Sequence, residues 1–216
     1  MGRPPLLSRQ ELLEKIIQCL WLHGYSATSI SQLVQATGVN AASLYAQFGS
    51  KKGMMAAAVE AYRQEAVEEM RALLATRSAG REQVSALLEH LLEQSLSDVQ
   101  RRGCFLVNCT LEGGPDAPEF TEAVRQAMRD LRGVFREALE RAPDLLPEVP
   151  PAEGAVLLQT QVWALKLLAR LGPSREDGQI IIHQTLRALF GMPPSAGTAP
   201  CAMLRQTETD GGSHQM

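Results

Sequence analysis

Residues 24–51 read GYSATSISQLVQATGVNAASLYAQFGSK, and this stretch decides the fold of the chain. Thr28 or Ser29 is suited to cap the start of a short helix, because a side-chain oxygen there accepts a bond from an unpaired backbone N–H. Gly38 ends that helix, and Asn40 caps the next one. Two short helices joined by so tight a turn predict a helix-turn-helix.

The two short helices have an inner and an outer side. The spacing of the apolar residues predicts a small core that holds the second helix across the first, made of Ile30, Leu33, Val39, Leu44 and Phe48. The second helix leaves other residues outside that core, namely Ala41, Ala42, Tyr45, Ala46 and Gln47. In a helix-turn-helix such outward residues meet base edges in the major groove of DNA.

Helical patterns continue on both sides of this stretch. Ser8 with Glu11 predicts a capping box for a helix that ends at Gly24, and Ser50 caps a long helix that reaches about Leu74. Further helices are predicted over residues 81–99, 103–113, 116–141, 151–171 and 174–190. We therefore expect an all-α chain with a three-helix DNA-binding head (8–54), a larger helical body (55–191) and a disordered tail (192–216).

Composition and charge agree with a helical DNA-binding protein. The 216 residues are 45% hydrophobic and only 5% aromatic, and the abundant Ala and Leu favour helices. The net charge is −3, but residues 1–53 carry five Lys and Arg against two Glu, which gives this part +3 and leaves −6 for the rest. A basic head on an acidic body suits a protein whose head contacts phosphates.

Missing patterns exclude several other classes of protein. The most apolar stretch, residues 155–171, is interrupted by Gln159, Gln161, Lys166 and Arg170, and is too polar for a membrane span. No apolar signal region opens the chain, so we expect a cytoplasmic protein. The four cysteines form no CxxC pair, and no HExxH, GxSxG or phosphate-loop motif occurs. We therefore expect no metal, no cofactor and no enzymatic activity.

Three fragments of the deciding stretch carry a family resemblance. They are GYSATSI at residues 24–30, TGVN at residues 37–40 and SLYAQFGSK at residues 43–51. In order and spacing they resemble the G-x-x-x-T-x-I, A-G-V-S and T-L-Y-x-x-F-x-S-K signature of the TetR (tetracycline-repressor) family. The resemblance implies an all-helical homodimer that binds a palindromic operator in double-stranded DNA and represses transcription until a small-molecule effector releases it.

The resemblance also implies roles for residues of the head. Thr28 and Ser29 would hold a phosphate through a hydroxyl and the N–H groups of a helix N-terminus, Tyr45 would lie against the DNA backbone, and Lys51 would pair with another phosphate. The DNA-binding set that it implies is Thr28, Ser29, Asn40, Ala41, Ala42, Ser43, Tyr45, Ala46, Gln47 and Lys51. The family often has Lys-Gly at the positions of Ala41 and Ala42, so the operator sequence stays open.

The body is expected to hold the effector and the dimer interface. Effector pockets are mostly apolar with a few polar groups, and candidate lining residues, each of which could instead be ordinary core, are Cys104, Leu106, Asn108, Glu112, Phe120, Phe135, Gln159 and Trp163. The last two helices predict a four-helix bundle across a two-fold axis, built on Leu157, Leu158, Leu165, Leu168, Ile181, Leu186 and Leu189. The two-fold would place the recognition helices about 34–36 Å apart.

Two alternatives stay open. Cys104 begins a predicted helix and follows Arg101 and Arg102, and both a helix N-terminus and neighbouring cations lower the pKa of a thiol. The protein would then be a redox- or electrophile-sensing repressor, whereas a buried Cys104 would be only a small hydrophobe. More remotely, the amphipathic helices would belong to a non-enzymatic adaptor that holds protein partners.

Overall fold

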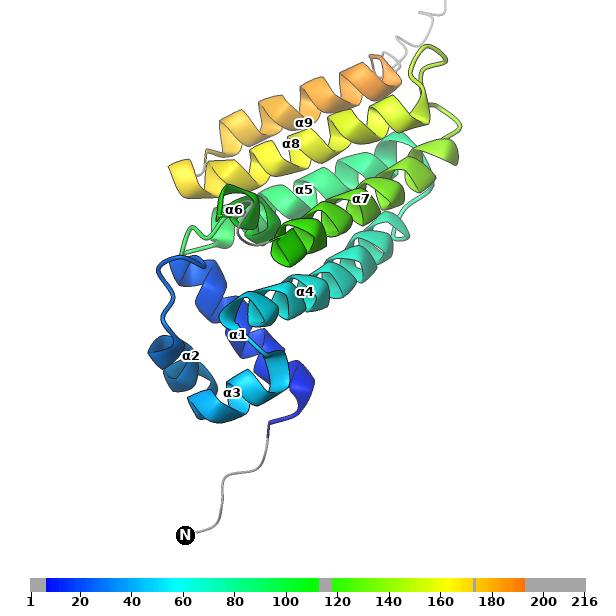
Figure 1. The fold of residues 1–216 in the computed structure, drawn as a ribbon. Coiled ribbons are helices and arrows are strands. Elements are labelled where there is room, and N and C mark those ends of the chain that lie inside the picture. Colours follow the sequence, from blue (N-terminus) through cyan, green and yellow to red (C-terminus); the bar gives the residue numbers. More distant parts are fainter. Residues whose placement is uncertain (1–6, 113–117, 173, 193–216) are drawn as a thin grey trace, which may run out of the picture.

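The computed structural model describes residues 7–112, 118–172 and 174–192, which form nine α-helices (Figure 1). The helices α1, α2 and α3 form a head at one end of the molecule, and α8 and α9 lie at the opposite end (Figure 1). The predicted helices are all present, with ends shifted by at most two residues. Their bounds are α1 Arg9–His23, α2 Ile30–Thr37, α3 Ala41–Phe48, α4 Lys51–Leu74, α5 Arg81–Ser97, α6 Phe105–Glu112, α7 Pro118–Glu140, α8 Pro151–Leu171 and α9 Arg175–Phe190.

Side-chain caps explain where the first four helices begin. The N–H of Ser8 donates to Glu11 Oε2 at 2.8 Å, and the N–H of Glu11 donates to Ser8 Oγ at 3.2 Å, which is the predicted capping box of α1. Ser29, rather than Thr28, caps α2 through the same kind of box with Gln32. The caps of α3 and α4 are, as predicted, Asn40 and Ser50. Each cap pairs a backbone N–H that the helix itself leaves unpaired.

The predicted helix-turn-helix is formed by α2 and α3. Gly38 joins them in the left-handed conformation, with φ +73° and ψ +6°, where a side chain would be strained. The small core beneath them matches the prediction: Leu33 and Leu44 are fully buried, and half-buried residues pack against them, namely Ile30, Val39 and Phe48. This core fixes α3 across α2 and leaves its other face in solvent.

The long helix α4 connects the head to the body without a break. Its first turns bury Met54 and Val59 in a core cluster that also contains Phe105 and Phe120 of the body. Its last turns contribute to a second cluster, which is shared with α5, α7, α8 and α9. The predicted boundary between residues 54 and 55 therefore falls inside a helix, and the head shares its core with the body.

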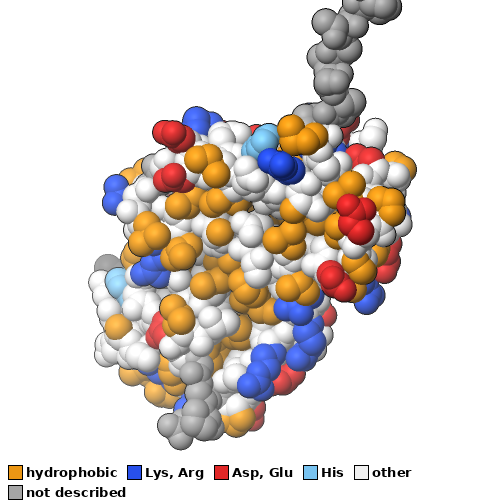
Figure 2. Space-filling view, turned by 90° about the horizontal axis from the view of Figure 1, so that it is seen from above, with side chains coloured by type: hydrophobic (Ala, Val, Ile, Leu, Met, Phe, Trp, Pro, Cys, Tyr) orange, Lys and Arg blue, Asp and Glu red, His pale blue; other side chains and the backbone are white. Residues whose placement is uncertain are grey.

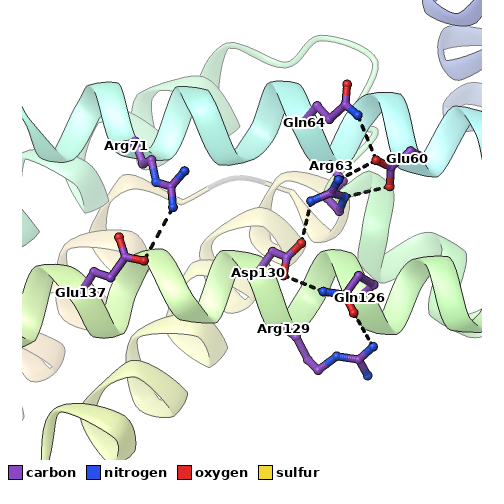
Figure 3. A network of polar contacts seen from close by, with 8 residues as sticks. All are labelled: Glu60, Arg63, Gln64, Arg71, Gln126, Arg129, Asp130 and Glu137. Carbon is purple, nitrogen blue, oxygen red and sulfur yellow. Dashed lines mark hydrogen bonds and ion pairs between the residues drawn. The ribbon is translucent and has the colours of Figure 1, made fainter.

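Polar contacts tie α4 to α7 (Figure 3). Arg63 on α4 donates to Asp130 on α7 at 2.6 Å and also to Glu60 of its own helix. The hydrogen-bonded guanidinium of Arg63 holds the pKa of the Glu60 carboxyl below its ordinary value. Because the Arg63 pair is partly shielded from water, it is worth more than an exposed pair and keeps α4 aligned with α7.

The last two helices bury more of their apolar residues within the chain than the sequence predicted. Four of the seven expected interface residues are buried in the second core cluster, namely Leu158, Leu165, Leu186 and Leu189, and the other three are half-buried. The large hydrophobic side chains that these helices do expose are Val156, Leu167, Leu171 and Ile180. Figure 2 looks onto this end of the molecule and shows hydrophobic side chains across the middle of the face, with many charged side chains nearer its margin.

Three expectations concern the chain as a whole: the disordered tail, the absence of a membrane span and the absence of a metal site. Of the predicted disordered tail 192–216, the structure describes only Met192, and the rest, including Cys201, lies outside the described residues. Among the helices that the structure describes, none combines the length and the apolar character needed to cross a membrane. The same residues contain no cluster of three or more His, Cys, Asp or Glu side chains suited to a metal ion.

Candidate DNA interface and effector cavity

The outer face of α3 is small and weakly charged. The residues of the predicted DNA-binding set that it exposes are Ala42, Tyr45, Ala46 and Gln47. Ala41 and Ser43 are half-buried instead. Gln47 carries the only side-chain amide on this face, and the exposed cap Asn40 uses its Oδ1 to accept the N–H of Ser43 at 2.9 Å. Hydrogen-bond readout of bases from α3 would therefore depend on Gln47.

The N-termini of α2 and α4 carry two further residues of the predicted DNA-binding set, Ser29 and Lys51. Ser29 is exposed at the start of α2, where unpaired N–H groups attract anions. Lys51 is the first residue of α4, and its Nζ lies 4.3 Å from the centre of the Tyr25 ring. Lys51 forms no ion pair with any Asp or Glu of the described residues, so none of these neutralises its charge. Both residues suit phosphate contacts.

Thr28 is not available for the phosphate contact that the resemblance implies. Its side chain is 1% exposed, and its hydroxyl donates to the Gly24 carbonyl at 2.5 Å. Its backbone N–H donates to the same carbonyl at 3.2 Å. Both donors of Thr28 are therefore used to shape the loop between α1 and α2, and Ser29 is the exposed residue at the N-terminus of α2.

The body contains a cavity of about 660 Å³ among α4, α5, α7, α8 and the loop over residues 98–104. Ligand pockets for small molecules span roughly 300–1,000 Å³, so the size suits one such molecule. Five of the eight candidate effector residues lie on its wall: Cys104, Leu106, Phe135, Gln159 and Trp163. Trp21 of α1 lines it as well, so the head itself contributes to the wall.

The other three candidates, Asn108, Glu112 and Phe120, do not line the cavity and hold other parts of the chain together. The Asn108 amide donates to the carbonyl of Arg102 at 2.9 Å. Glu112 Oε2 accepts the N–H of Ser26 at 2.7 Å, which ties the end of α6 to the head. The ring of Phe120 stacks on Tyr25 with the centroids 6.0 Å apart. Their wrong assignment has a simple cause, since α6 and the start of α7 face the head as well as the cavity.

Gln159 is paired at both ends of its amide. It is 1% exposed, its Nε2 donates to the Met128 carbonyl at 2.8 Å, and its Oε1 accepts Arg132 Nε at 2.8 Å. A buried amide that pairs both ends is well satisfied. Gln159 therefore fixes α8 against α7 on the cavity wall.

Sequence reasoning missed several polar residues of the cavity wall. They are Tyr62, Glu69, Gln94, Asp98, Arg102 and Lys166. One of them carried a signal: Lys166 interrupts the most apolar stretch of the chain, and a charge within such a stretch often marks a site. The others lie on helix faces that the sequence pattern alone does not assign to any cavity.

Aromatic rings connect the cavity wall to the head. Phe105 of α6 is fully buried, and its ring centroid lies 5.7 Å from that of Trp21 on α1 and 4.9 Å from that of Tyr62 on α4. Trp21 and Tyr62 meet edge to face at 5.5 Å. Because Trp21 and Tyr62 also line the cavity, this cluster packs directly between the cavity and the helices of the head.

Cys104 lies on the cavity wall directly before α6, but its surroundings disfavour the expected thiolate. Burial raises the pKa of the Cys104 thiol above its ordinary value. The N–H groups of Val107 and Leu106 and the charge of Lys166 lower that pKa, but by less than burial raises it. The sequence-based expectation of a lowered thiol pKa is therefore wrong in direction, because it counted the helix N-terminus and neglected desolvation.

The two arginines before Cys104 do not assist the thiol as predicted. Arg102 donates to Asp98 Oδ1 at 3.3 Å and to the side chain of Gln18 at 2.8 Å, and its guanidinium lies 4.7 Å from the centre of the Trp21 ring. Arg101 is exposed. The guanidinium of Arg102 therefore interacts with Asp98, Gln18 and the Trp21 ring.

Alkylation of Cys104 should be slow at neutral pH. A thiol whose pKa is raised holds little thiolate at pH 7, so its reaction with iodoacetamide should be slower there than that of an ordinary thiol and should rise steadily with pH. Peptide mass spectrometry of a Cys109→Ser protein would follow the reaction at Cys104 across pH. A rate at pH 7 equal to that of an unfolded cysteine peptide would contradict the effect of burial.

Two family models match the chain. One, described as bacterial regulatory proteins, tetR family, matches residues 12–58, and the other, described as tetracyclin repressor-like, C-terminal domain, matches residues 80–175. The HTH-type transcriptional repressor ComR of Escherichia coli strain K12 is 30% identical to this chain over an alignment of 193 residues that covers 86% of this chain and 90% of ComR. The two family models together, and the match to ComR, span head and body.

Solved structures have the same architecture. A cysteine mutant of the TetR family transcriptional regulator CifR, complexed with a 26 bp double-strand operator DNA, is 28% identical with a TM-score of 0.75, covering 86% of this chain and 99% of that one. The reduced form of E. coli NemR, at 20% identity, shares the fold with a TM-score of 0.77, covering 87% of this chain and 98% of that one. With its helix-turn-helix head and helical body, the chain belongs to the TetR family of transcriptional regulators.

Proposed function

We propose that the protein is a cytoplasmic repressor that binds a palindromic operator as a homodimer and leaves it when a small molecule fills the cavity. In this proposal residues 8–54 read the DNA, and residues 55–191 bind the effector and dimerise. The observation that carries it is the course of α4, which begins at Lys51 in the head and lines the cavity between Tyr62 and Met70. One rigid helix thus joins the two sites.

Contacts of α6 offer a second route from the cavity to the DNA face. This helix starts beside the cavity at Cys104, and at its other end Glu112 holds the N–H of Ser26. The neighbouring Tyr25 lies under Lys51. An effector that binds more tightly to a shifted α6 would move this loop and change the spacing of the two recognition helices.

The proposed dimer interface lies on α8 and α9, whose exposed large hydrophobic side chains are Val156, Leu167, Leu171 and Ile180. Figure 2 shows hydrophobic side chains on this end of the molecule. Exposed apolar side chains gathered on adjoining helices favour association with an equal surface on a second copy. A two-fold axis between two such faces would pair the two heads for a palindromic operator.

Lys51→Ala should weaken binding to all DNA sequences alike. A duplex recovered by repeated selection from a randomised library would serve as the operator, with binding followed by fluorescence anisotropy at several salt concentrations. Loss of one phosphate contact should flatten the slope of log K against log[salt] by about one. Lys51→Arg keeps the charge and should keep the slope. An unchanged slope for Lys51→Ala would show that Lys51 does not contact a phosphate.

Gln47→Ala should instead change which bases are preferred. If the amide of Gln47 reads a base edge, its removal should cost about 1–3 kcal/mol on the selected duplex and little on random DNA. Repeating the selection with the variant should relax the preference at one or two positions of each half-site. Equal losses on selected and random DNA would place Gln47 on the backbone.

A second candidate function is thiol sensing through Cys104, favoured by its place on the cavity wall. Oxidation or alkylation there would add bulk beside α6 and could release the operator without a bound ligand. Hydrogen peroxide and N-ethylmaleimide should then release the wild-type protein from the selected duplex and leave Cys104→Ser bound. Release that persists in Cys104→Ser would remove this candidate.

A further inference from the structure

We propose that the cavity takes a ligand with an aromatic or similarly apolar body and one carboxylate, and that Lys166 binds the carboxylate. The proposal deepens the effector role and rests on the proposed function only in treating the occupant as the effector. The charges and hydrogen bonds of the cavity wall support the carboxylate site itself.

Lys166 is a partly buried cation without a carboxylate partner. It lies on the cavity wall, and its Nζ donates to Gln94 Oε1 at 2.8 Å. An ammonium group has three donors, and among the described residues no Asp or Glu lies within ion-pair distance of this one. Burial lowers the pKa of Lys166 by more than the charges of Glu69 and Asp98 raise it, so its charged form lacks full compensation. A ligand carboxylate would supply the missing charge and use the remaining donors.

The carboxylates of the wall are occupied elsewhere or lie in solvent. Asp98 accepts both the backbone N–H of Arg102 at 2.7 Å and its Nε at 3.3 Å. Glu69 is exposed and accepts the Gln94 amide at 3.0 Å, and Glu65 is exposed as well. Water screens these exposed charges, so they attract a cationic ligand less than the shielded Lys166 attracts an anionic one.

A second donor of the wall lacks a partner. The Nε1 of Trp21 is buried and has no hydrogen-bond partner among the described residues, although Trp21 lines the cavity. Buried N–H groups without an acceptor are uncommon in folded proteins. Lys166 and Trp21 therefore bring to the wall two side chains with unused donors. Its aromatic and aliphatic members, Phe135, Leu131 and Trp163, suit an apolar ligand body.

The test compares acid, amide and amine on a common ring. The full-length protein is titrated by calorimetry near neutral pH with indole-3-acetate, indole-3-acetamide and tryptamine, and with the corresponding naphthalene compounds. In at least one series the carboxylate should bind about ten- to a hundredfold more tightly than the amide, which is the range expected for a charge-assisted hydrogen bond. The amine should bind most weakly.

Variants of one helix assign the preference to Lys166. Lys166→Met should reduce the affinity for the carboxylate to that for the amide, and Lys166→Arg should retain part of the difference. Arg170→Met removes a cation from α8 outside the cavity and should leave the difference unchanged. Circular dichroism would establish that each variant is folded.

Several results would overturn the proposal. They are an amide or amine that binds as tightly as its acid, a carboxylate preference that survives Lys166→Met in the folded protein, and the absence of carboxylate binding in both series. Operator binding is measured separately, on the selected duplex and without any compound. A protein that binds the carboxylates but no duplex would contradict the proposed function and leave the carboxylate site standing.

Discussion

Phe105→Ala should lower the free energy of unfolding by about 3–5 kcal/mol, as expected for truncation of a fully buried phenylalanine. Phe105 is 1% exposed and packs between Trp21 of the head and Tyr62 of α4. Its removal would leave a hole next to the existing cavity, where few neighbours can close in. A loss of this size is a large part of the 5–15 kcal/mol that typically stabilises a domain.

Urea denaturation at a fixed protein concentration would measure the effect, since a dimer's stability depends on concentration. Leu111→Ala is the matched control, because Leu111 lies on the same helix but is 82% exposed. Its effect should stay within about 0.5 kcal/mol. Equal effects of the two substitutions would contradict the role of Phe105 in joining the head to the body.

A protein with both Leu167→Glu and Ile180→Glu should be monomeric and should bind the selected operator at least about a hundredfold more weakly. The two side chains are 50% and 53% exposed on α8 and α9. Glutamates there would remove apolar area and place like charges against those of the second copy. A monomer has one recognition helix, so it loses the effective concentration that links two half-sites, worth about 10²–10⁴ in affinity.

Sedimentation at micromolar concentration and fluorescence anisotropy would measure the two effects on the same samples. Leu111→Glu places the same charge on an exposed leucine of α6 and should leave both assembly and binding unchanged. A double variant that stays dimeric would move the interface away from this face. A folded monomer that binds the operator as tightly as the wild type would contradict the need for a dimer.

Local chemistry made the head predictable from the sequence. The caps Ser8, Asn40 and Ser50 act on N–H groups within three residues of themselves, and the turn at Gly38 requires a positive φ. The small core around Leu33 and Leu44 closes over a short stretch of chain. The phosphate contact expected of Thr28 was wrong. Thr28 and Ser29 are adjacent hydroxyl residues that look alike in the sequence, and only the packing of the loop shows that Thr28 is buried.

The cavity was predictable only in part. An amphipathic pattern shows that one face of a helix is buried, but not which helix or hollow lies against it. Phe135 and Trp163 line the cavity, whereas Phe120, of the same chemical kind, packs on Tyr25. The residues of the proposed dimer face could not be predicted for the same reason. Leu158 and Leu167 lie on one apolar helix, but only Leu167 is exposed.

The sequence by itself determined the helices, the helix-turn-helix and the family, because caps, turns and a short-range core depend on residues near one another in the chain. The tertiary structure decided which side chains meet across helices: Glu112 with Ser26, Arg63 with Asp130, and Lys166 with Gln94. It also set the pKa of Cys104, since desolvation depends on what buries the thiol and not on its neighbours in sequence. Contacts between distant residues follow from how helices cross, which the pattern of any single helix leaves undetermined.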